Sequence, residues 1–312
     1  MKMFVTGGCG FIGSNFIRKN INEHKITNID KLTYAGNLKN LNGVNDSKNY
    51  TFFKKDICDK ESMEKIMKGH DVVIHFAGET HVDRSIKSPE IFTKTNVFGT
   101  QNLLESARKN DIEKFIYIST DEVYGSISVG TAKECAPFRP SSPYSASKAS
   151  ADLLCQSYFK TYGLPIIITR PSNNFGPFQN KEKLIPHFVT NLYQNKKVPL
   201  YGSGKNLRNW IYVVDTCRAI NFLIENGKNG EAYNVGGKNI KTNLTITRYI
   251  LQHFHKSDRW IENVEDRPGH DFRYALSNVK MKKLGWNEEF RFLLALFQTI
   301  GWYENNEWWW KD

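Results

Sequence analysis

The first half of the chain alternates short apolar runs with longer amphipathic stretches. The apolar runs predict strands at Lys2–Thr6, Ile26–Ile29, Tyr50–Lys54, Val72–Ala77, Phe115–Ser119 and Ile166–Arg170. Between them, apolar residues recur at helical spacing and predict helices at Gly10–Asn20, Lys60–Met67, Ile91–Lys109 and Tyr144–Tyr162. Strands that alternate with helices are typical of a parallel sheet with helices on both faces. The sequence therefore predicts an α/β fold with a Rossmann-type, doubly wound parallel sheet.

The pattern changes after residue 170, where the predicted elements become shorter. Proline and glycine punctuate this part of the chain, at Pro177, Pro186, Pro199, Gly202 and Gly204. Short elements separated by proline and glycine are expected of a smaller α/β domain that covers a ligand on the sheet. We expect residues 1–170 to form the sheet domain, completed by parts of 209–235. Residues 171–312 are then a substrate-binding cap that is interleaved with it.

Length and composition exclude two broad classes of protein. The chain has 312 residues, 40% hydrophobic and 24% charged, which is ordinary for a globular protein and unlike a disordered one. No apolar stretch is long enough to cross a bilayer, and the N-terminus does not resemble a signal peptide. We therefore expect a cytoplasmic protein without a membrane partner. The five scattered cysteines favour small buried groups over disulfides or a metal site: Cys9, Cys58, Cys135, Cys155 and Cys217.

The net charge of +11 suggests an anionic partner: a nucleic acid, a membrane surface or a small molecule that carries phosphate. Nucleic-acid binding favours clustered basic residues with aromatic residues among them, whereas the lysines here are scattered. We therefore expect no nucleic-acid partner, and keep a regulatory nucleic-acid-binding protein as the alternative from another class. Trp308–Trp310 are expected to dock on the core or on a partner subunit rather than to stack on bases.

A glycine-rich turn follows the first predicted strand and opens the first predicted helix. Its glycines have the spacing GxxGxxG, which permits a tight turn and brings backbone N–H groups close to a pyrophosphate. Asp30 ends the second strand about 20 residues later, where a carboxylate can accept hydrogen bonds from an adenosine ribose. Because a carboxylate repels a 2′-phosphate, NAD is the expected cofactor. The turn contributes Gly7, Gly10, Phe11, Ile12 and Gly13 to this site.

Three further residues belong to the predicted cofactor site. Lys31 follows Asp30, and its charge could soften the discrimination against NADP. Asp56 and Ile57 follow the third predicted strand, where Asp56 could hold the adenine edge. The alternative for Asp56 is a cap of the helix that begins near Lys60, and spacing alone leaves both interpretations open.

Tyr144 and Lys148 lie one turn apart on the same face of a predicted helix. A lysine ammonium beside a phenol favours the phenolate, so we expect a lowered pKa that lets Tyr144 take a hydroxyl proton near neutral pH. Ser119 and Thr120 end an upstream strand, at the edge where a doubly wound sheet binds its ligand. With the glycine turn, these residues indicate oxidation of a hydroxyl group by NAD.

Together these features resemble the extended short-chain dehydrogenase/reductase superfamily. More narrowly, the chain is similar to nucleoside-diphosphate-glucose 4,6-dehydratases of the dTDP-glucose type, nearly end to end. The matching stretches are GGCGFIGSNFI at 7–17, KLTYAGNLKNL at 31–41, HFAGETHVDRSI at 75–86, STDEVYG at 119–125, SPYSASKASADLL at 142–154, RPSNNFGPFQ at 170–179, KLIPHF at 183–188, RNWIYVVD at 208–215 and VEDRPGHDFRYAL at 264–276. The most discriminating is Thr120-Asp121-Glu122, because related epimerases usually lack an Asp-Glu pair there.

The resemblance implies a hydro-lyase that uses NAD to convert a nucleoside-diphosphate-glucose to its 4-keto-6-deoxy product. Tyr144, with Lys148 and Thr120 beside it, would deprotonate the C4 hydroxyl as C4 is oxidised. Glu122 would then take the acidified C5 proton and Asp121 would protonate the departing C6 oxygen, before hydride returns to C6. Consecutive strand residues face opposite ways, so both carboxyl groups can serve one site only if the strand has ended. The alternative for the pair is a helix cap.

The resemblance also assigns binding residues. Ala77 and Thr95 join the cofactor site. The substrate site comprises Glu79, Thr80, His81, Asn173, Lys183, Arg208, Arg267 and His270. Arginine suits this site because it offers two parallel donors to phosphate, although His81 with Asp83 and Arg84 could instead form a local loop network.

Two matters stay open in the sequence. Lys181 departs from the common pattern, which leaves dTDP-glucose and UDP-glucose both possible, with dTDP favoured. A UDP-hexose 4-epimerase or a UDP-glucuronate decarboxylase would share the same cofactor signals.

The two long predicted helices, Ile91–Lys109 and Tyr144–Tyr162, resemble the family's dimer interface, so we expect a homodimer.

Overall fold

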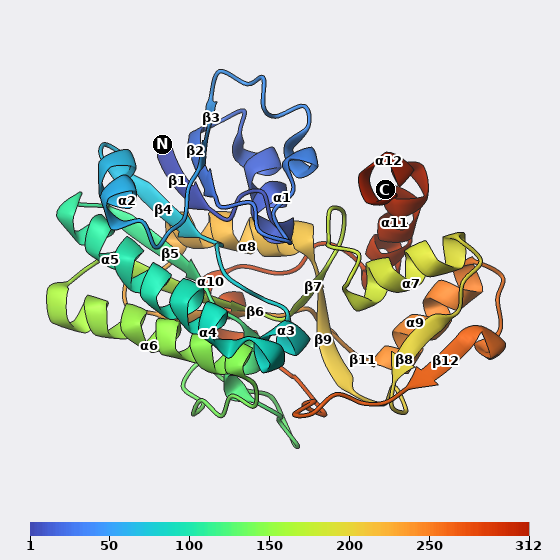
Figure 1. The fold of residues 1–312 in the computed structure, drawn as a ribbon. Helices are drawn as coiled ribbons and strands as arrows, with labels where there is room; N and C mark the ends of the chain where they lie inside the picture. The colour runs from blue at the N-terminus through green and yellow to red at the C-terminus, as the bar shows by residue number, and fades with distance from the viewer. Residues whose placement is uncertain (312) are drawn as a thin grey trace.

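A large parallel sheet organises the computed structural model, which describes residues 1–311. Within that range, seven strands pair in the order β10-β6-β5-β4-β1-β2-β3 (Figure 1). Their bounds are β1 (Lys2–Thr6), β2 (Lys25–Asp30), β3 (Tyr50–Lys54), β4 (Val72–His75), β5 (Lys114–Ile118), β6 (Ile166–Pro171) and β10 (Ala232–Val235). The order reverses between β1 and β4, which opens a crevice at the carboxyl ends of these strands.

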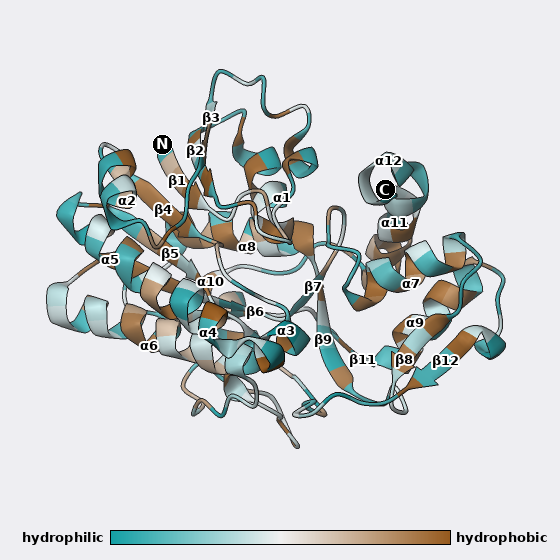
Figure 2. Cartoon of the chain, viewed as in Figure 1, coloured by the Kyte–Doolittle hydropathy of each residue, from teal (hydrophilic) through white to brown (hydrophobic). Residues whose placement is uncertain are grey.

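Helices cover both faces of this sheet, so the predicted doubly wound α/β fold is confirmed. On one face α1 (Phe11–Asn20) packs against α8 (Val213–Asn226). On the other face α2 (Lys60–Met67), α5 (Thr100–Lys109) and α6 (Pro143–Tyr162) lie side by side (Figure 1). Figure 2 shows hydrophobic residues along the covered strands and hydrophilic ones on the peripheral loops.

The predicted helix Ile91–Lys109 is interrupted. It consists of α4 (Pro89–Phe92), a π-helical segment η2 (Thr93–Gly99) and α5. Inside it, the Thr100 hydroxyl donates to the Asn96 carbonyl at 2.6 Å, and the Asn96 amide bonds both the Glu79 backbone and the Ser147 hydroxyl. These side-chain bonds compete with the regular helical ladder, which periodicity alone does not reveal.

A second lobe carries two smaller sheets. One contains β7 (Asn173–Phe175), β9 (Leu207–Tyr212) and β11 (Asn239–Thr242), and the other pairs β8 (Val198–Tyr201) with β12 (Ile261–Val264). Its helices are α7 (Leu184–Tyr193), α9 (Asn243–His253), α11 (Phe292–Asn305) and α12 (Glu307–Trp310). The remaining elements are α3 (Val82–Lys87), α10 (Val279–Leu284) and the 3₁₀ turns η1 (Leu38–Leu41), η3 (Asp121–Tyr124) and η4 (Asp258–Trp260). Since β10 returns to the large sheet, the two lobes are interleaved in sequence.

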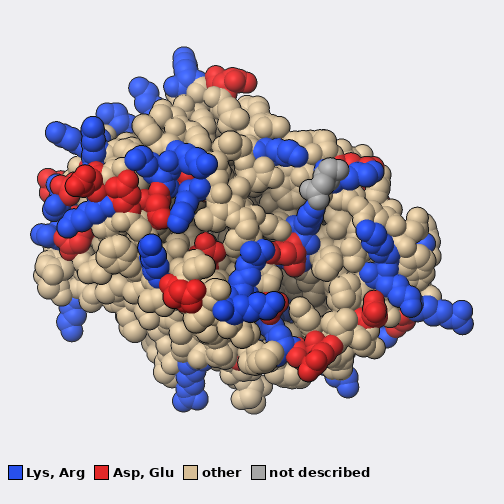
Figure 3. Space-filling view, in the orientation of Figure 1, with Lys and Arg blue, Asp and Glu red and all other residues tan. Residues whose placement is uncertain are grey.

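Basic side chains are spread over the molecule. Figure 3 shows Lys and Arg at several separate places on the visible face, with Asp and Glu among them. This distribution agrees with the scattered lysines of the sequence. Among the described residues, none of the helices combines the length and the apolar character needed to cross a membrane.

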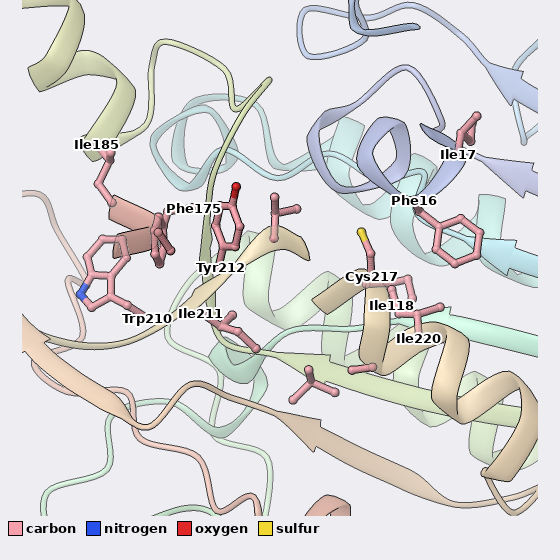
Figure 4. Packing of buried hydrophobic residues seen from close by; sticks show 14 of the residues in the cluster. Phe16, Ile17, Ile118, Phe175, Ile185, Trp210, Ile211, Tyr212, Cys217 and Ile220 are labelled. Atoms are coloured by element: carbon pink, nitrogen blue, oxygen red, sulfur yellow. The ribbon is translucent and has the colours of Figure 1, made fainter. Parts of the chain in front are cut away.

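One hydrophobic core joins the two lobes. Phe16, Ile17, Ile118, Cys217 and Ile220 belong to the sheet and its helices, whereas Phe175, Ile185, Trp210, Ile211 and Tyr212 belong to the second lobe (Figure 4). All ten are buried, and they form a single cluster. Each Å² of apolar surface buried at this junction contributes about 25 cal/mol to stability. The junction therefore holds the second lobe beside the crevice.

The terminal tryptophans and the cysteines divide between the core and the surface. Trp309 is buried and donates to Asn40 Oδ1 at 2.6 Å, so the predicted docking on the core is confirmed, while Trp308 remains exposed. Cys9, Cys155 and Cys217 are buried as expected, whereas Cys58 is only half-buried. The expectation is wrong for Cys135, which is exposed on the connection between η3 and α6.

Candidate active site

A cleft lies at the carboxyl ends of the central strands and extends under the second lobe. Figure 3 shows acidic and basic side chains together around the recess near the centre of the view. Most of the predicted site residues line this cleft: Gly7, Gly10, Phe11, Ile12, Gly13, Asp30, Lys31, Asp56, Ile57, Ala77, Glu79, Thr80, Thr95, Thr120, Asp121, Glu122, Tyr144, Lys148, Asn173 and Lys183. The tertiary structure thus brings together residues from nine separate segments.

The glycine turn is built for a close approach of backbone. Gly7 has φ +72°, and a Cβ there would lie 2.5 Å from the Ala77 backbone nitrogen. A Cβ on Gly13 would lie 2.4 Å from the Gly7 carbonyl oxygen. Helix α1 starts after Gly10 without a side-chain cap, which leaves its first N–H groups free for an anion. This cradle fits a dinucleotide pyrophosphate.

The acidic residue after β2 is buried beside this turn. Asp30 Oδ2 accepts a hydrogen bond from Cys9 N at 2.9 Å, and Oδ1 accepts one from Leu32 N at 2.8 Å. Burial raises the pKa of Asp30. The carboxyl group is therefore held rigidly at the wall of the cleft, where a ribose would meet it.

The positive charge of Lys31 is neutralised by the carboxylate of Asp56. Lys31 Nζ lies 2.7 Å from Asp56 Oδ2. Burial opposes ionisation of Asp56, but the hydrogen bond and charge of Lys31 outweigh it and lower the pKa of Asp56. The alternative role of Asp56 as a helix cap is wrong, because Asp59 caps α2 by accepting from Ser62 N.

The acidic pair follows a strand that has already ended. Strand β5 stops at Ile118, and Thr120 caps the 3₁₀ turn η3 by accepting a hydrogen bond from Glu122 N at 3.3 Å. The turn brings Asp121 and Glu122 to the same cleft. The strand geometry therefore allows both to serve one site, and the cap is Thr120 rather than the acidic pair.

The two carboxyl groups differ in their surroundings. Burial raises the pKa of Asp121 well above its usual range, and the charge of Glu122 adds to this rise. Burial also raises the pKa of Glu122, but the charges of Arg267, Arg208 and Lys183 oppose the rise. Two neighbouring carboxyl groups cannot easily both ionise, and the cations oppose the rise most strongly at Glu122, so the surroundings favour the proton on Asp121 and the charge on Glu122.

Tyr144 and Lys148 line the cleft together, but they do not interact as expected. Burial raises the pKa of Tyr144 and the charge of Glu122 adds to it, while a hydrogen bond with Thr120 opposes the rise. Lys148 Nζ donates instead to the Ile118 carbonyl at 2.6 Å, and burial lowers its pKa to about 8. The expectation that Lys148 lowers the pKa of Tyr144 is therefore wrong for this arrangement of the side chains.

Four predicted substrate residues lie outside the lining of the cleft. His81 caps α3 and lies 3.5 Å from Glu182, which matches the alternative of a local loop network. His270 pairs with Asp266, and Arg267 lies 3.7 Å from Asp83, while its Nε is buried and has no hydrogen-bond partner among residues 1–311. Arg208 donates to backbone carbonyls of the 271–272 segment. The charges of both arginines nevertheless act on Glu122, so they border the site.

Sequence reasoning missed three residues at this place. Tyr274 Oη lies 2.7 Å from Asp271 Oδ2 and 3.4 Å from Glu122 Oε2. Glu182 lines the cleft and contacts both His81 and Arg84. Tyr274 and Asp271 stand within the matching stretch 264–276, and Glu182 directly precedes another. The family resemblance therefore covers or borders all three residues, but within 264–276 it assigns binding roles only to Arg267 and His270.

Comparison with known proteins agrees with this geometry. The model of the GDP-mannose 4,6 dehydratase family matches residues 4–296. The dTDP-glucose 4,6-dehydratase of Streptomyces niveus is 45% identical over 319 residues, which cover all of this chain and 95% of that protein. A low-salt glycan biosynthesis protein of Haloferax volcanii is 47% identical and covers 97% of this chain and 98% of its own.

Solved structures extend the likeness to three dimensions. The dTDP-glucose 4,6-dehydratase of Streptomyces venezuelae, crystallised with NAD and TYD bound, has a TM-score of 0.98 and 43% identity, and the match covers 100% of this chain and 99% of that one. The enzyme of Bacillus anthracis, solved with NAD, has a TM-score of 0.93 and 46% identity, with 100% and 99% covered. The protein therefore belongs to the dTDP-glucose 4,6-dehydratase family of NAD-dependent sugar epimerases and dehydratases.

Proposed function

We propose that this protein is a dTDP-glucose 4,6-dehydratase, a lyase that removes water from dTDP-glucose and releases the 4-keto-6-deoxy sugar nucleotide. The observation that carries the proposal is the pair Asp121–Glu122, which faces the same cleft as Tyr144. Burial raises the pKa of Asp121 well above its usual range, whereas three cations oppose the rise in the pKa of Glu122, which suits one acid and one base. An epimerase needs no such pair.

NAD is the proposed cofactor. When bound, it supplies the oxidation of C4 and the later reduction of C6. The glycine turn and the start of α1 would hold the pyrophosphate, and Asp30 would bind a ribose. Because Asp56 neutralises Lys31, the cation that directly follows Asp30 is engaged and does not attract a 2′-phosphate. The other residues proposed to contact it are Ile57, Ala77, Thr95, Tyr144 and Lys148.

The first proton transfer is assigned to Tyr144. Its phenolate takes the proton of the C4 hydroxyl as C4 becomes a ketone. The hydrogen bond with Thr120 favours the phenolate against the burial that opposes it. Lys148, anchored on the Ile118 carbonyl, presents a cation to the same part of the cleft.

The elimination is assigned to the acidic pair. The C4 carbonyl acidifies the C5 hydrogen, and Glu122 takes that proton while Asp121 protonates the C6 oxygen, which leaves as water. Glu122 returns its proton to C5 when C6 is reduced, and the proton held by Tyr144 restores Asp121. The net change is the loss of one water.

The nucleoside diphosphate is proposed to lie between the lobes. Asn173, Lys183, Arg208, Arg267 and His270 are assigned to it, with Glu79, Thr80 and His81 nearer the sugar. Arg267 supports this assignment because its Nε is buried without a partner and can donate to a phosphate. On this division residues 1–170, with parts of 209–235, bind the cofactor, and the interleaved remainder of 171–312 binds the substrate.

A cytoplasmic homodimer is part of the proposal. Exposed hydrophobic side chains lie along α4, η2 and α6, among them Ile91, Phe98, Leu153 and Tyr162. Leu153 is 55% exposed and Tyr162 is 54% exposed, which is unusual for side chains of this kind on a helix that faces only water. Sedimentation should therefore give twice the mass of the chain.

The direct test is incubation of the purified protein with dTDP-glucose and, in separate reactions, with UDP-glucose and with UDP-glucuronate, with no cofactor added. We expect dTDP-glucose to lose one water, as measured by mass spectrometry. A product of unchanged mass would identify an epimerase, and loss of carbon dioxide from UDP-glucuronate would identify a decarboxylase. Either result without dehydration would refute the proposal.

A further inference from the structure

Asp271 joins three parts of the site. It lies on the segment between β12 and α10 and is buried. Its carboxylate accepts hydrogen bonds from the Tyr274 phenol and from the Ser141 hydroxyl, directly before the Ser142 cap of α6. Its backbone carbonyl accepts a hydrogen bond from Arg208 at 2.9 Å. A single residue therefore connects the Tyr144 helix, Arg208 and Tyr274.

Tyr274 stands between two carboxyl groups with one proton to donate. Its oxygen is 2.7 Å from Asp271 Oδ2 and 3.4 Å from Glu122 Oε2, so the donation goes to Asp271. Burial and the charges of Glu122 and Asp271 raise the pKa of Tyr274, which keeps it a donor. The Arg208 guanidinium lies 4.4 Å from the ring centre and fixes the ring from its face.

We propose that Asp271 is a positioning residue for the elimination: it takes the single hydrogen bond of Tyr274 and so leaves Glu122 free to accept the C5 proton. The inference rests on the proposed function, because it assumes that Glu122 is the base. Asp271 lies behind Tyr274 and is not among the described residues that line the cleft, so its role is assigned to the Tyr274 hydrogen bond and to its charge.

The charge of Asp271 works in the same direction. Burial raises the pKa of Glu122, three cations oppose that rise, and the charge of Asp271 supports it. In Asp271→Asn this negative charge is lost. The Tyr274 hydroxyl then has a neutral amide and the ionised Glu122 as its possible acceptors, and it donates its hydrogen bond to Glu122. A hydrogen bond to a carboxylate lowers its pKa, so both changes make Glu122 a weaker base.

The experiment measures kcat against pH for the wild-type holoenzyme and for Asp271→Asn. General base catalysis contributes about 10²- to 10⁴-fold to a reaction rate, and a weakened base loses only part of this factor. We therefore expect kcat with dTDP-glucose to fall about tenfold. The acid limb of the profile should move to lower pH, and reduced cofactor should accumulate because oxidation at C4 outpaces elimination. KM should change little. An unshifted acid limb in a folded variant would overturn the inference.

A double variant separates positioning from structure. If Asp271 acts through the phenol proton, Asp271→Asn combined with Tyr274→Phe should be at least as active as Asp271→Asn alone. Multiplied losses would overturn the mechanism. Tyr274→Phe alone keeps the ring under Arg208, and it serves if Asp271→Asn does not fold. Its acid limb should stay in place, whereas a shift to higher pH would show that Tyr274 donates mainly to Glu122.

The controls keep the two proposals apart. Asp258→Asn removes an exposed carboxylate of the second lobe, which pairs with Arg248 at the surface, and should leave kcat unchanged. If the wild-type protein does not dehydrate dTDP-glucose, the proposed function fails. If it does, and Asp271→Asn keeps the wild-type profile, only the role of Asp271 fails.

Discussion

The two halves of the cleft are built in different ways. The half beside β1 and α1 is built mainly from backbone groups: a turn with a left-handed glycine and an uncapped helix start. Its one buried carboxylate, Asp30, is itself held by two backbone N–H groups. The half beside η3 consists of side chains, where two carboxyl groups meet cations from the second lobe. Backbone geometry suits a ligand that is held throughout, whereas opposed side-chain charges suit proton transfer.

The largest effect is expected at the side-chain half. Glu122→Gln removes the proposed base but keeps its size, so dehydration should fall by about 10²- to 10⁴-fold. Oxidation at C4 should continue, and the absorbance of reduced NAD should build up after dTDP-glucose is added. Glu262→Gln, an exposed glutamate of β12, is the control. Turnover at the wild-type rate would remove Glu122 from the mechanism.

The backbone half should fail by losing its cofactor. Gly7→Ala puts a Cβ 2.5 Å from the Ala77 nitrogen on a backbone with φ +72°. Gly43→Ala is a matched control, because φ is +80° and nothing lies within 4 Å of the added atom. The control should lose about 1–2 kcal/mol of stability from its left-handed backbone alone. Gly7→Ala should lose more and should purify without NAD, as measured by thermal unfolding and cofactor content. Equal losses would show that the close approach is unimportant.

The electrostatic contrast predicts a shift in pH dependence. With Glu122 as the proposed base, kcat should fall as the pH drops through the pKa of Glu122, which burial raises. Arg267 holds that pKa down, and Arg267→Gln should therefore move the acid limb to higher pH and raise KM about tenfold, as expected for one lost charged contact. Arg248→Gln, at the surface, should change neither. An acid limb that stays in place would mean that Arg267 does not reach the base.

The smallest effect is expected on cofactor choice. Asp56→Asn frees Lys31 beside Asp30, and the ratio of NADP to NAD bound should rise about two- to fivefold, the range of a partly exposed ion pair. Competition binding followed by mass spectrometry of the retained cofactor measures this ratio. Asp258→Asn, which removes an exposed carboxylate paired with Arg248 on the second lobe, serves as the control. A ratio that does not change would assign the preference to Asp30 alone.

The same contrast explains which residues could be predicted from the sequence. Gly7, Gly10, Gly13 and Asp30 lie within one strand-turn-helix-strand unit, so their spacing indicates their place directly. Tyr274 contacts Glu122 across 152 residues of sequence, and the charge of Asp271 acts on Glu122 over a similar separation in sequence, which nothing local to them indicates. The interruption of the helix at η2 could not be predicted for a similar reason. It accompanies hydrogen bonds from Asn96 to Glu79 and Ser147, which lie in other segments of the chain.

By itself, the sequence determined the alternation of strands and helices, the glycine turn, the acidic pair and the resemblance to one family. These depend on periodicity, backbone freedom and contiguous motifs, which are local properties. Only the tertiary structure decided that Lys148 bonds the Ile118 carbonyl, that Asp56 neutralises Lys31 and that cations from the second lobe surround Glu122. Burial and charge between distant segments set these properties, because proton affinity depends on what packs around a group in space and not on its neighbours in the chain.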